Sequence, residues 1–322
     1  MTELSNQKDG FCTAFFMLLV ALCVISWYHW LVKKPNKVNP PLPPGPSVIQ
    51  QVGDLFSLRR DPISYLDKLS KRYGPIIKFK YGARLCIVIS SASVAKEVFK
   101  DHDTIFANHD DSVVAYAGTW GGTDLGWAPH GEDWRMLRKI CALEFLNFSR
   151  LDALYYHRRR EVRSMVSQLY SNSCNSINIG DYIFSSMFNG VTNMLWGGTL
   201  EGEEMKHFNA EVLEALENFL ALLNSLNISD LFPVLAVLDI QGLATRMKKI
   251  NTWFDKKFNF IIGRSLDKKD QKETKDFLQA LLHVKECGDQ KSSFSTTHIK
   301  GLLMVISAHF CFHIFLFFCA SL

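Results

Sequence analysis

A long apolar run lies near the N-terminus of the chain. Residues 11–32 carry no formal charge, and a helix of that length reaches roughly 33 Å, enough to cross the hydrocarbon core of a bilayer. Two tryptophans and a tyrosine stand at its C-terminal end, lysines follow at once, and the preceding ten residues are not basic. Aromatic residues mark membrane interfaces and basic residues stay cytosolic. The pattern predicts a transmembrane anchor at 11–32, a lumenal tail at 1–10 and a cytosolic body.

A cleaved signal peptide is the alternative to an anchor. The run is long for a signal peptide, its N-terminal flank is not basic, and no small-residue cleavage site precedes the lysines. An uncleaved anchor is therefore favoured. The next segment, 33–46, is basic and then rich in proline. Because stacked prolines cannot continue a helix and favour an extended chain, it is predicted to be a stiff hinge.

The body of the chain begins with a mixture of short elements. A proline directly after an aspartate cap predicts a helix over 62–73. The β-rich runs 76–81 and 85–89 predict a hairpin. A helix over 92–100 follows, and residues 104–130 have no period, so they are predicted to form a long loop.

Apolar positions recur at helical spacing through most of the remaining chain. The predicted helices cover residues 131–146, 150–171, 180–196, 203–226, 242–264 and 274–285. A little β-structure followed by many helices indicates a mainly α fold.

Composition excludes several classes of protein. The net charge is only +4 and the basic residues are scattered, which does not indicate a nucleic-acid partner. None of the eight cysteines forms a C-x-x-C pair, so neither a zinc site nor a redox motif is indicated. His309 and His313 have ligand spacing on a helix, but no third ligand accompanies them and no metal site is predicted.

The residues most suggestive of chemistry are Trp134 and Arg138. They are four positions apart, so they share one face of a helix. An indole N–H and a guanidinium on one face form a two-donor clamp for a carboxylate. Taken alone, W-x-x-x-R more often reflects packing beside a solvated charge.

A series of motifs gives this pair a context. In order they are Pro43-Pro44-Gly45-Pro46, Arg72-Tyr73-Gly74-Pro75, Phe106-Ala107-Asn108, Trp134 through Lys139, Asp276-Phe277-Leu278 and Ile299 through Met304. Their order and approximate spacing resemble the N-terminal half of a microsomal cytochrome P-450, and the chain is most similar to plant enzymes that hydroxylate flavonoids and terpenoids. The resemblance covers about residues 40–304.

The resemblance implies roles for individual residues. Trp134 and Arg138 match the pair that hydrogen-bonds a haem propionate. For His109 the resemblance implies at most a polar contact. Residues 113–127 match a substrate-contacting segment, and 213–238 match lid helices over the substrate channel. The implied substrate-binding residues are Val113, Val114, Gly121, Thr123 and Phe219.

The resemblance also implies a fold and an activity. The expected fold is the mainly α cytochrome P-450 fold, truncated in its central long helix, with a small N-terminal β-hairpin and one N-terminal transmembrane helix. The expected activity is haem-dependent monooxygenation of a small lipophilic substrate, with electrons from NADPH through a reductase. The expected location is the endoplasmic reticulum membrane, single-pass, with the body in the cytosol and membrane lipid as a further partner.

Several parts of the family pattern are missing. No cysteine lies in an F-x-x-G-x-R-x-C haem loop, and the oxygen-activating [AG]-G-x-[DE]-T motif does not follow Met304. Without a thiolate the iron lacks the ligand that favours O–O cleavage. The chain by itself is therefore expected to be inactive, and no catalytic residue is assigned. The alternatives are a truncated, non-catalytic, membrane-anchored binding or decoy protein, and a membrane-bound helical interaction protein.

The last residues depart from the family pattern. The expected division is 47–304 for the partial domain and 305–322 for a divergent apolar tail, which is long enough to be a second membrane span. An abrupt change after Met304 suggests that the gene model runs into an intron, and sequencing cDNA across codon 304 tests this.

A basic cluster lies in the predicted helix 150–171. It comprises His157, Arg158, Arg159, Arg160 and Arg163. A solvated helix face is the favoured interpretation. The alternative is contact with an acidic reductase or with anionic lipid.

Overall fold

The computed structural model describes part of the chain in detail. The described residues are 17–20, 22–24, 26–27, 41–47, 61–110, 112–200, 202–267, 276–287 and 294–321. The predicted lumenal tail lies outside them, as do parts of the predicted anchor and hinge. Among the described residues, no helix combines the length and the apolar character needed to span a bilayer.

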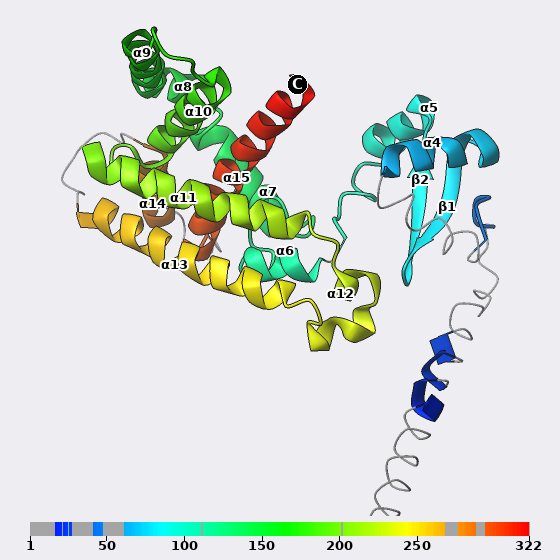
Figure 1. The fold of residues 1–322 in the computed structure, drawn as a ribbon. Helices are drawn as coiled ribbons and strands as arrows, with labels where there is room; N and C mark the ends of the chain where they lie inside the picture. Colours follow the sequence, from blue (N-terminus) through cyan, green and yellow to red (C-terminus); the bar gives the residue numbers. More distant parts are fainter. Residues whose placement is uncertain are drawn as a thin grey trace, which may run out of the picture. The chain divides into compact units, whose positions relative to one another are not determined.

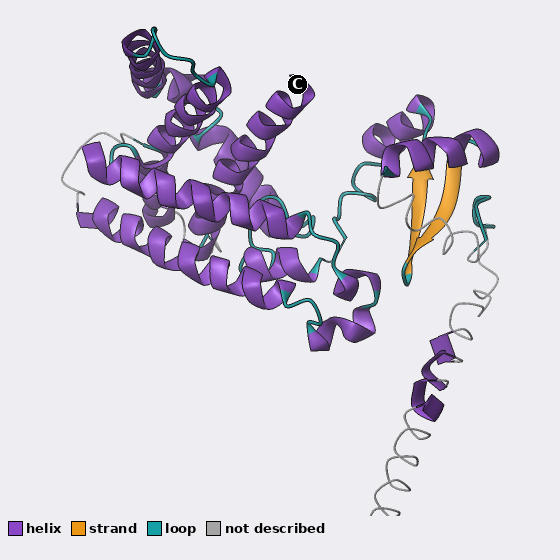
Figure 2. Ribbon diagram, viewed as in Figure 1, coloured by secondary structure: helices purple, strands orange, loops and turns teal. Residues whose placement is uncertain are grey.

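The chain divides into two compact units, Met1–His102 and Asp103–Leu322. Both strands belong to the N-terminal unit, and the described part of the second unit contains helices and loops (Figure 2). Each unit is considered by itself.

The N-terminal unit packs one helix on a hairpin. Its elements are α4 (Pro62–Tyr73), β1 (Ile76–Tyr81), β2 (Arg84–Ile89), α5 (Ala92–Lys96) and the π-helical η1 (Glu97–Asp101). The strands are antiparallel, with Ile76 opposite Ile89 and Tyr81 opposite Arg84. The predicted helix 62–73 and the predicted hairpin are both confirmed.

The proline-rich motif is attached to this hairpin. The backbone N–H of Lys78 donates to the carbonyl of Pro44 at 2.9 Å. A Cβ at Gly45 would lie 2.0 Å from the carbonyl oxygen of Lys78. Only glycine permits so close an approach of two backbones, so residues 44–45 are part of the folded unit and not merely a spacer.

The second unit is a helical assembly (Figure 1). Its elements are α6 (Val113–Gly118), α7 (Glu132–Glu144), α8 (Phe148–Ala153), α9 (Tyr155–Ser171), α10 (Ile179–Trp196), α11 (Gly202–Leu223), α12 (Ile228–Leu231), η2 (Pro233–Leu238), α13 (Leu243–Asp267), α14 (Phe277–Cys287) and α15 (Thr296–Ser321).

The structure corrects two of the predicted boundaries. The predicted loop 104–130 contains α6, which begins after Ser112, whose hydroxyl accepts from the N–H of Ala115 at 3.4 Å. Six residues are too few for a helical period to show in the sequence. The predicted helix 150–171 is two helices that meet at Leu154, where the backbone is not helical.

The core of the second unit lies where α10, α11, α13, α14 and α15 meet. Trp196, Phe254 and Phe258 are fully buried there, and the rings of the two phenylalanines stack at 5.6 Å. The long helices α11 and α13 lie side by side (Figure 1). Residues 302–304 and 306–308 of α15 are also buried. The helix therefore continues into the core past Met304.

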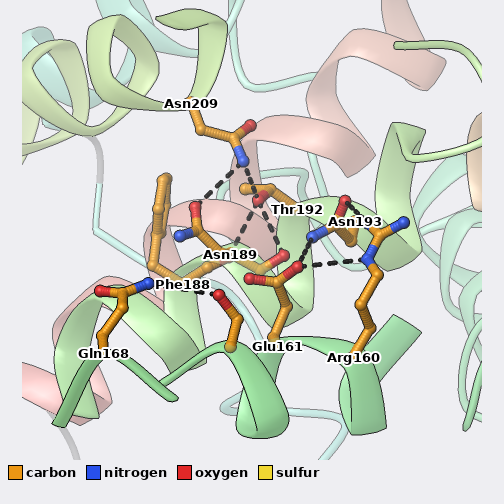
Figure 3. Close-up of polar contacts among 9 residues, drawn as sticks. Arg160, Glu161, Gln168, Phe188, Asn189, Thr192, Asn193 and Asn209 are labelled. Carbon is orange, nitrogen blue, oxygen red and sulfur yellow. Dashed lines mark hydrogen bonds and ion pairs between the residues drawn. The ribbon is translucent and has the colours of Figure 1, made fainter. Parts of the chain in front are cut away.

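Polar side chains join α10 to its neighbours (Figure 3). Asn209 on α11 donates to Asn189 at 3.2 Å and to Thr192 at 2.8 Å, and it accepts from the indole of Trp196 at 3.1 Å. Asn209 is 3% exposed. Buried amides are tolerated when their hydrogen bonds are made, so this network fixes α11 against α10.

Helix α9 is held by polar contacts as well. Asn193 on α10 donates to Glu161 at 3.0 Å and accepts from Arg160 at 3.0 Å (Figure 3). No residue of α9 is buried. The apolar positions at helical spacing in this helix, such as Val162 and Val166, are exposed.

Asp276 links the end of α10 to the start of α14. It accepts from the N–H of Gly198 at 2.9 Å, the hydroxyl of Thr199 at 3.0 Å and the N–H of Gln279 at 2.8 Å. Burial raises the pKa of Asp276 to about 6, although these hydrogen bonds act to lower it.

Replacing Asp276 by Asn is expected to reduce the pH dependence of stability. The pKa of Asp276 in the folded chain, about 6, exceeds the ordinary 3.8. The proton-linked stabilisation is thus fully present below pH 3.8 and is lost as the pH rises through about 6. Between about pH 5 and about pH 7 the free energy of unfolding should fall by about 1 kcal/mol from this group. Urea unfolding at the two pH values measures it.

The matched control is Glu203→Gln, which removes an exposed carboxylate from the same unit. The control should keep the wild-type pH dependence. An equal pH dependence in Asp276→Asn and wild type would contradict the assignment.

Candidate functional site

The two residues predicted to clamp a carboxylate lie together on α7. Trp134 is half-buried and Arg138 is exposed. The guanidinium carbon of Arg138 is 5.1 Å from the centroid of the Trp134 ring, and the ring of His130 meets the same indole edge-on at 5.3 Å. Among the described residues, no carboxylate pairs with Arg138. Its N–H donors therefore remain available to an anionic ligand.

The start of α7 is fastened to the segment that precedes α6. The N–H of His130 donates to the side chain of Asn108 at 2.7 Å. The rings of His109 and Trp127 lie 5.7 Å apart. Asn108 and His109 thus help to place the N-terminus of the helix that carries Trp134 and Arg138. The predicted polar role of His109 toward a ligand stays a prediction.

Helix α6 is capped by a residue from a distant segment. Asp230 on α12 accepts from the hydroxyl of Ser112 at 3.0 Å and from the N–H of Val113 at 2.8 Å. A carboxylate at a helix N-terminus satisfies N–H groups that have no partner within the helix. This contact joins the substrate-contacting segment predicted from the sequence to the predicted lid.

A groove lies beside this contact. Its volume is about 800 Å³. The lining residues are Ser112 just before α6, Val113, Tyr116 and Ala117 of α6, Ala236 and Val237 of η2, Asp239 after it, and Ala244, Thr245 and Lys248 of α13. The walls are small and apolar side chains with a few polar groups, which is the usual composition of a small-molecule site.

The end of α13 next to the groove is also capped. Asp239 has a left-handed backbone, with φ of 40°. Its carboxylate accepts from the N–H of Ala244 at 3.2 Å and from the N–H and hydroxyl of Thr245 at 2.9 and 2.7 Å. Burial acts to raise the pKa of Asp239, but these hydrogen bonds outweigh it and the pKa lies below the ordinary value. The stretch from α12 through η2 is therefore held by carboxylates at Asp230 and Asp239.

A tight turn follows α6. Trp120, Gly121 and Gly122 have φ of 49°, 81° and 77°, all in the left-handed region. A Cβ at Gly122 would lie 2.8 Å from the ring of Tyr116, which lines the groove. Thr123 donates its hydroxyl to the carbonyl of Thr119 at 3.3 Å. The predicted residues Gly121 and Thr123 belong to this turn and are not among the groove's lining residues.

Two other predicted residues are in the core. Val114 is 2% exposed and Phe219 is 3% exposed. The ring of Phe219 meets Phe254 edge-on at 6.4 Å. A Cβ at Gly118 would lie 2.6 Å from the Phe219 ring and 2.9 Å from the sulfur of Met247. Phe219 thus supports α6 from behind, and its contact with a substrate stays a prediction.

No pattern in the sequence predicted the buried charged residues near the turn. Asp124 is 3% exposed and accepts from the N–H of Trp127 at 2.7 Å. Burial raises the pKa of Asp124 to about 6, although hydrogen bonds from the backbone of Trp127 and Gly126 act to lower it. Lys300 on α15 is 7% exposed and pairs with Asp255 on α13. Charged residues at such positions look like surface residues until the tertiary contacts are known.

Comparison with known proteins places the chain in a family. The family model described as Cytochrome P450 matches residues 43–308. Strychnine-11-hydroxylase from Strychnos nux-vomica is 31% identical over 301 residues, which are 90% of this chain and 58% of the relative. Flavonoid 3'-monooxygenase from Crocosmia x crocosmiiflora is 29% identical over 302 residues, 91% of this chain and 58% of the relative. The chain thus spans 58% of the length of both relatives.

A solved structure supports the fold. A zebrafish cytochrome P450 with progesterone is similar with a TM-score of 0.60 at 18% identity. The similarity covers 77% of this chain and 55% of that chain. At this identity the likeness speaks for the mainly helical fold alone.

Replacing Asp230 by Ala is expected to loosen α6. The change removes two charge-assisted hydrogen bonds, worth about 2 kcal/mol together. Limited proteolysis should then cleave residues 112–118 several-fold faster than in wild type.

A matched control is Glu214→Gln, which removes an exposed carboxylate on α11. Equal cleavage rates in the Asp230 and Glu214 variants would show that the cap does not hold α6 in place.

Proposed function

The chain belongs to the cytochrome P450 family, and we propose that it contributes to a haem-dependent monooxygenase that hydroxylates small lipophilic plant metabolites. The observation that carries the proposal is the pair of donors on α7. The pair occupies the family's motif position, and the exposed guanidinium of Arg138 has no carboxylate partner among the described residues. Because the chain spans 58% of two curated relatives, activity is proposed for the protein to which these residues belong.

The residues present fit the family's cofactor. Haem, when bound, supplies the iron at which such enzymes activate dioxygen. Arg138 would donate to a haem propionate in the two-pronged manner that suits a carboxylate, and the indole N–H of Trp134 would be the second donor. His130 and the Asn108 contact hold Trp134 and the start of α7 in place.

The groove supports a small lipophilic substrate. Val113, Ala117, Ala236 and Val237 form apolar walls, and an apolar molecule gains roughly 25 cal/mol for each Å² of surface that it buries there. Ser112, Asp239 and Thr245 add polar groups that would orient a hydroxylated ring. We propose flavonoids or terpenoids as the substrate class.

The five predicted substrate residues take different parts in this proposal. Val113 would touch the substrate in the groove. Gly121 and Thr123 do not line the groove, and they would contact a substrate that extends beyond it to the turn. Val114 and Phe219 would shape the wall from the core side, because both are nearly inaccessible to solvent.

For the 322 residues by themselves we propose no catalysis. No cysteine of the sequence lies in the haem-binding pattern of the family. Burial raises the pKa of the Cys86 and Cys141 thiols, which keeps both protonated. A protonated thiol is a poor iron ligand. A non-catalytic binding protein would be the remaining role for this chain alone.

Part of the basic cluster on α9 is committed to internal contacts. Arg158 donates to the carbonyl of Leu151 at 2.8 Å, and Arg160 donates to Asn193. Arg159 and Arg163 are exposed. If an NADPH-dependent reductase docks on this helix through an acidic surface, these two arginines are the side chains able to meet it.

We propose that the protein is held at the endoplasmic reticulum membrane with its body in the cytosol. The uncharged run 11–32 and the lysines after it support this. Val234 and Val237 of η2 are 89% and 92% exposed, and the basic residues Arg246, Lys248 and Lys249 follow in α13. An apolar tip beside basic residues suits a membrane surface.

Deleting residues 11–32 is expected to release the chain from membranes. In microsomes the unaltered chain should stay in the pellet after alkaline carbonate extraction, and the deleted form should move to the supernatant. Immunoblotting of both fractions measures the distribution. Release of the unaltered chain by carbonate would contradict a transmembrane anchor.

The proposed function is tested by haem binding. The product of the longest transcript that contains residues 43–308 should give a reduced, CO-bound absorption band at the thiolate-haem position, and the 322-residue chain should give none. Replacing Arg138 by Ala in the longer product should weaken haem retention by about 2 kcal/mol, or roughly 30-fold.

Lys139→Ala is the matched control, because Lys139 is also exposed on α7 but lies about 100° around the helix axis from Arg138. It should keep haem as wild type does. A thiolate band from the 322-residue chain would refute its proposed inactivity, and equal haem loss in both variants would refute the propionate role of Arg138.

A further inference from the structure

One carboxylate joins three segments of the second unit. Asp255 on α13 accepts from the ammonium of Lys300 on α15 at 2.5 Å. The same oxygen accepts from the indole N–H of Trp120, in the turn after α6, at 3.1 Å. Its other oxygen accepts from Asn259 on α13 at 3.1 Å.

The carboxylate of Asp255 neutralises the buried ammonium of Lys300. The side chain of Lys300 is 9% exposed, whereas the side chain of Asp255 is 38% exposed. A buried ammonium without a counter-ion is strongly disfavoured, whereas a carboxylate at the surface remains hydrated. The pKa of Asp255 reflects the pairing, because burial acts to raise it but Lys300 and Trp120 outweigh burial and lower it.

Trp120 has a backbone conformation that other contacts must stabilise. Its φ of 49° lies in the left-handed region, which bulky residues rarely adopt. Such a conformation persists only where surrounding contacts hold it. The bond to Asp255 and the packing of the Trp120 ring against the core are such contacts.

Gly301, the residue after Lys300 on α15, allows the turn to pack directly against that helix. A Cβ at Gly301 would lie 3.1 Å from the Cβ of Asp124 and 3.2 Å from the carbonyl oxygen of Thr123. The backbone of the turn therefore rests on the helix at Gly301, one residue after Lys300. One end of the turn thus lies against α15, and the other end is bound to Asp255, the carboxylate with which Lys300 of α15 pairs.

We infer that Asp255 is a positioning residue for the turn 120–124. Its carboxylate, neutralised by Lys300, holds the Trp120 indole and so sets where Gly121 and Thr123 stand relative to α13 and α15. The role in specificity rests on the proposed function, in which those two residues touch substrate. A displacement of α13 would carry the turn with it.

The turn offers its own reporters. The N–H of Gly121 donates to Tyr116 at 3.0 Å, and those of Gly122 and Thr123 donate to Thr119 at 3.1 and 3.0 Å. These bonds protect the amides from exchange with solvent for as long as the turn is held.

The test is hydrogen exchange by mass spectrometry on the full chain. Asp255→Asn should raise exchange at residues 119–128 at least tenfold, because it removes the negative charge that strengthens the bond from Trp120 and strands the Lys300 ammonium. Lys300→Met should raise it less, because the exposed side of Asp255 stays hydrated. The double variant should exchange more slowly than Asp255→Asn, since the stranded charge is gone.

Two further variants separate positioning from general stability. Trp120→Phe removes the indole N–H but keeps a ring and leaves the Lys300 pair intact, so it should loosen the turn and not α14. Glu204→Gln is the matched control. It breaks another ion pair of α13, with Arg264 at 2.7 Å, where both side chains are 45% exposed. It should leave the turn unchanged.

The outcomes are distinct. Faster exchange confined to the turn in Asp255→Asn and Trp120→Phe supports the inference. An unchanged turn in Asp255→Asn, or an equal rise in the turn and in α14, overturns it. Because no haem or substrate enters this measurement, its result is independent of the haem test of the proposed function.

The specificity role has its own readout in the haem-binding longer product. Asp255→Asn should change the ratio of dissociation constants for two substrate-class ligands by fivefold or more at unchanged haem content. A loosened turn with an unchanged ratio would overturn that role.

Discussion

Burial of the first half of α15 is the constraint on which the second unit depends. Ile299, Leu302, Leu303 and Met304 are almost completely inaccessible to solvent. Helices α7, α10, α11 and α14 pack around this stretch, because an apolar helix needs partners on several sides to leave water. Lys300 and Gly301 are carried into the same environment. Their special contacts, an ion pair and a backbone close approach, follow from that burial.

Buried polar groups give the helices their relative positions. Apolar packing alone allows helices to slide, because many registers bury similar areas. Asp276 and Asp255 each accept hydrogen bonds from at least two segments of the chain. Asn209 on α11 accepts from Trp196 and donates to Thr192, both on α10. A misplaced helix would leave these groups unsatisfied in a poorly solvated interior, at a cost of about 1–3 kcal/mol for each group. Carboxylates and amides therefore define the arrangement that apolar residues stabilise.

The groove and the α7 pair differ in how far they could be foreseen. Trp134 and Arg138 are four residues apart on one helix, so their proximity follows from helix geometry. Val113 lines the same groove as Ala236 and Val237, and Asp230 ties α6 to the lid segment across more than a hundred residues. Phe219 was expected near a substrate, and the fold places its ring against Gly118 and Phe254. The order of the family's motifs along the sequence identified the segments. Tertiary packing decided whether each side chain faces the groove or the core.

The sequence by itself determined the mainly helical class, the hairpin, most helix positions and the α7 pair, because these depend on local periodicity, caps and spacing along one element. It could not determine α6, the break at Leu154 or the exposure of α9, because short helices carry no clear period and burial depends on neighbours. Nor could it reveal the partners of Asp255, Asp276 and Lys300. Those contacts join residues far apart in the chain, and only the tertiary structure brings their charges within reach of one another.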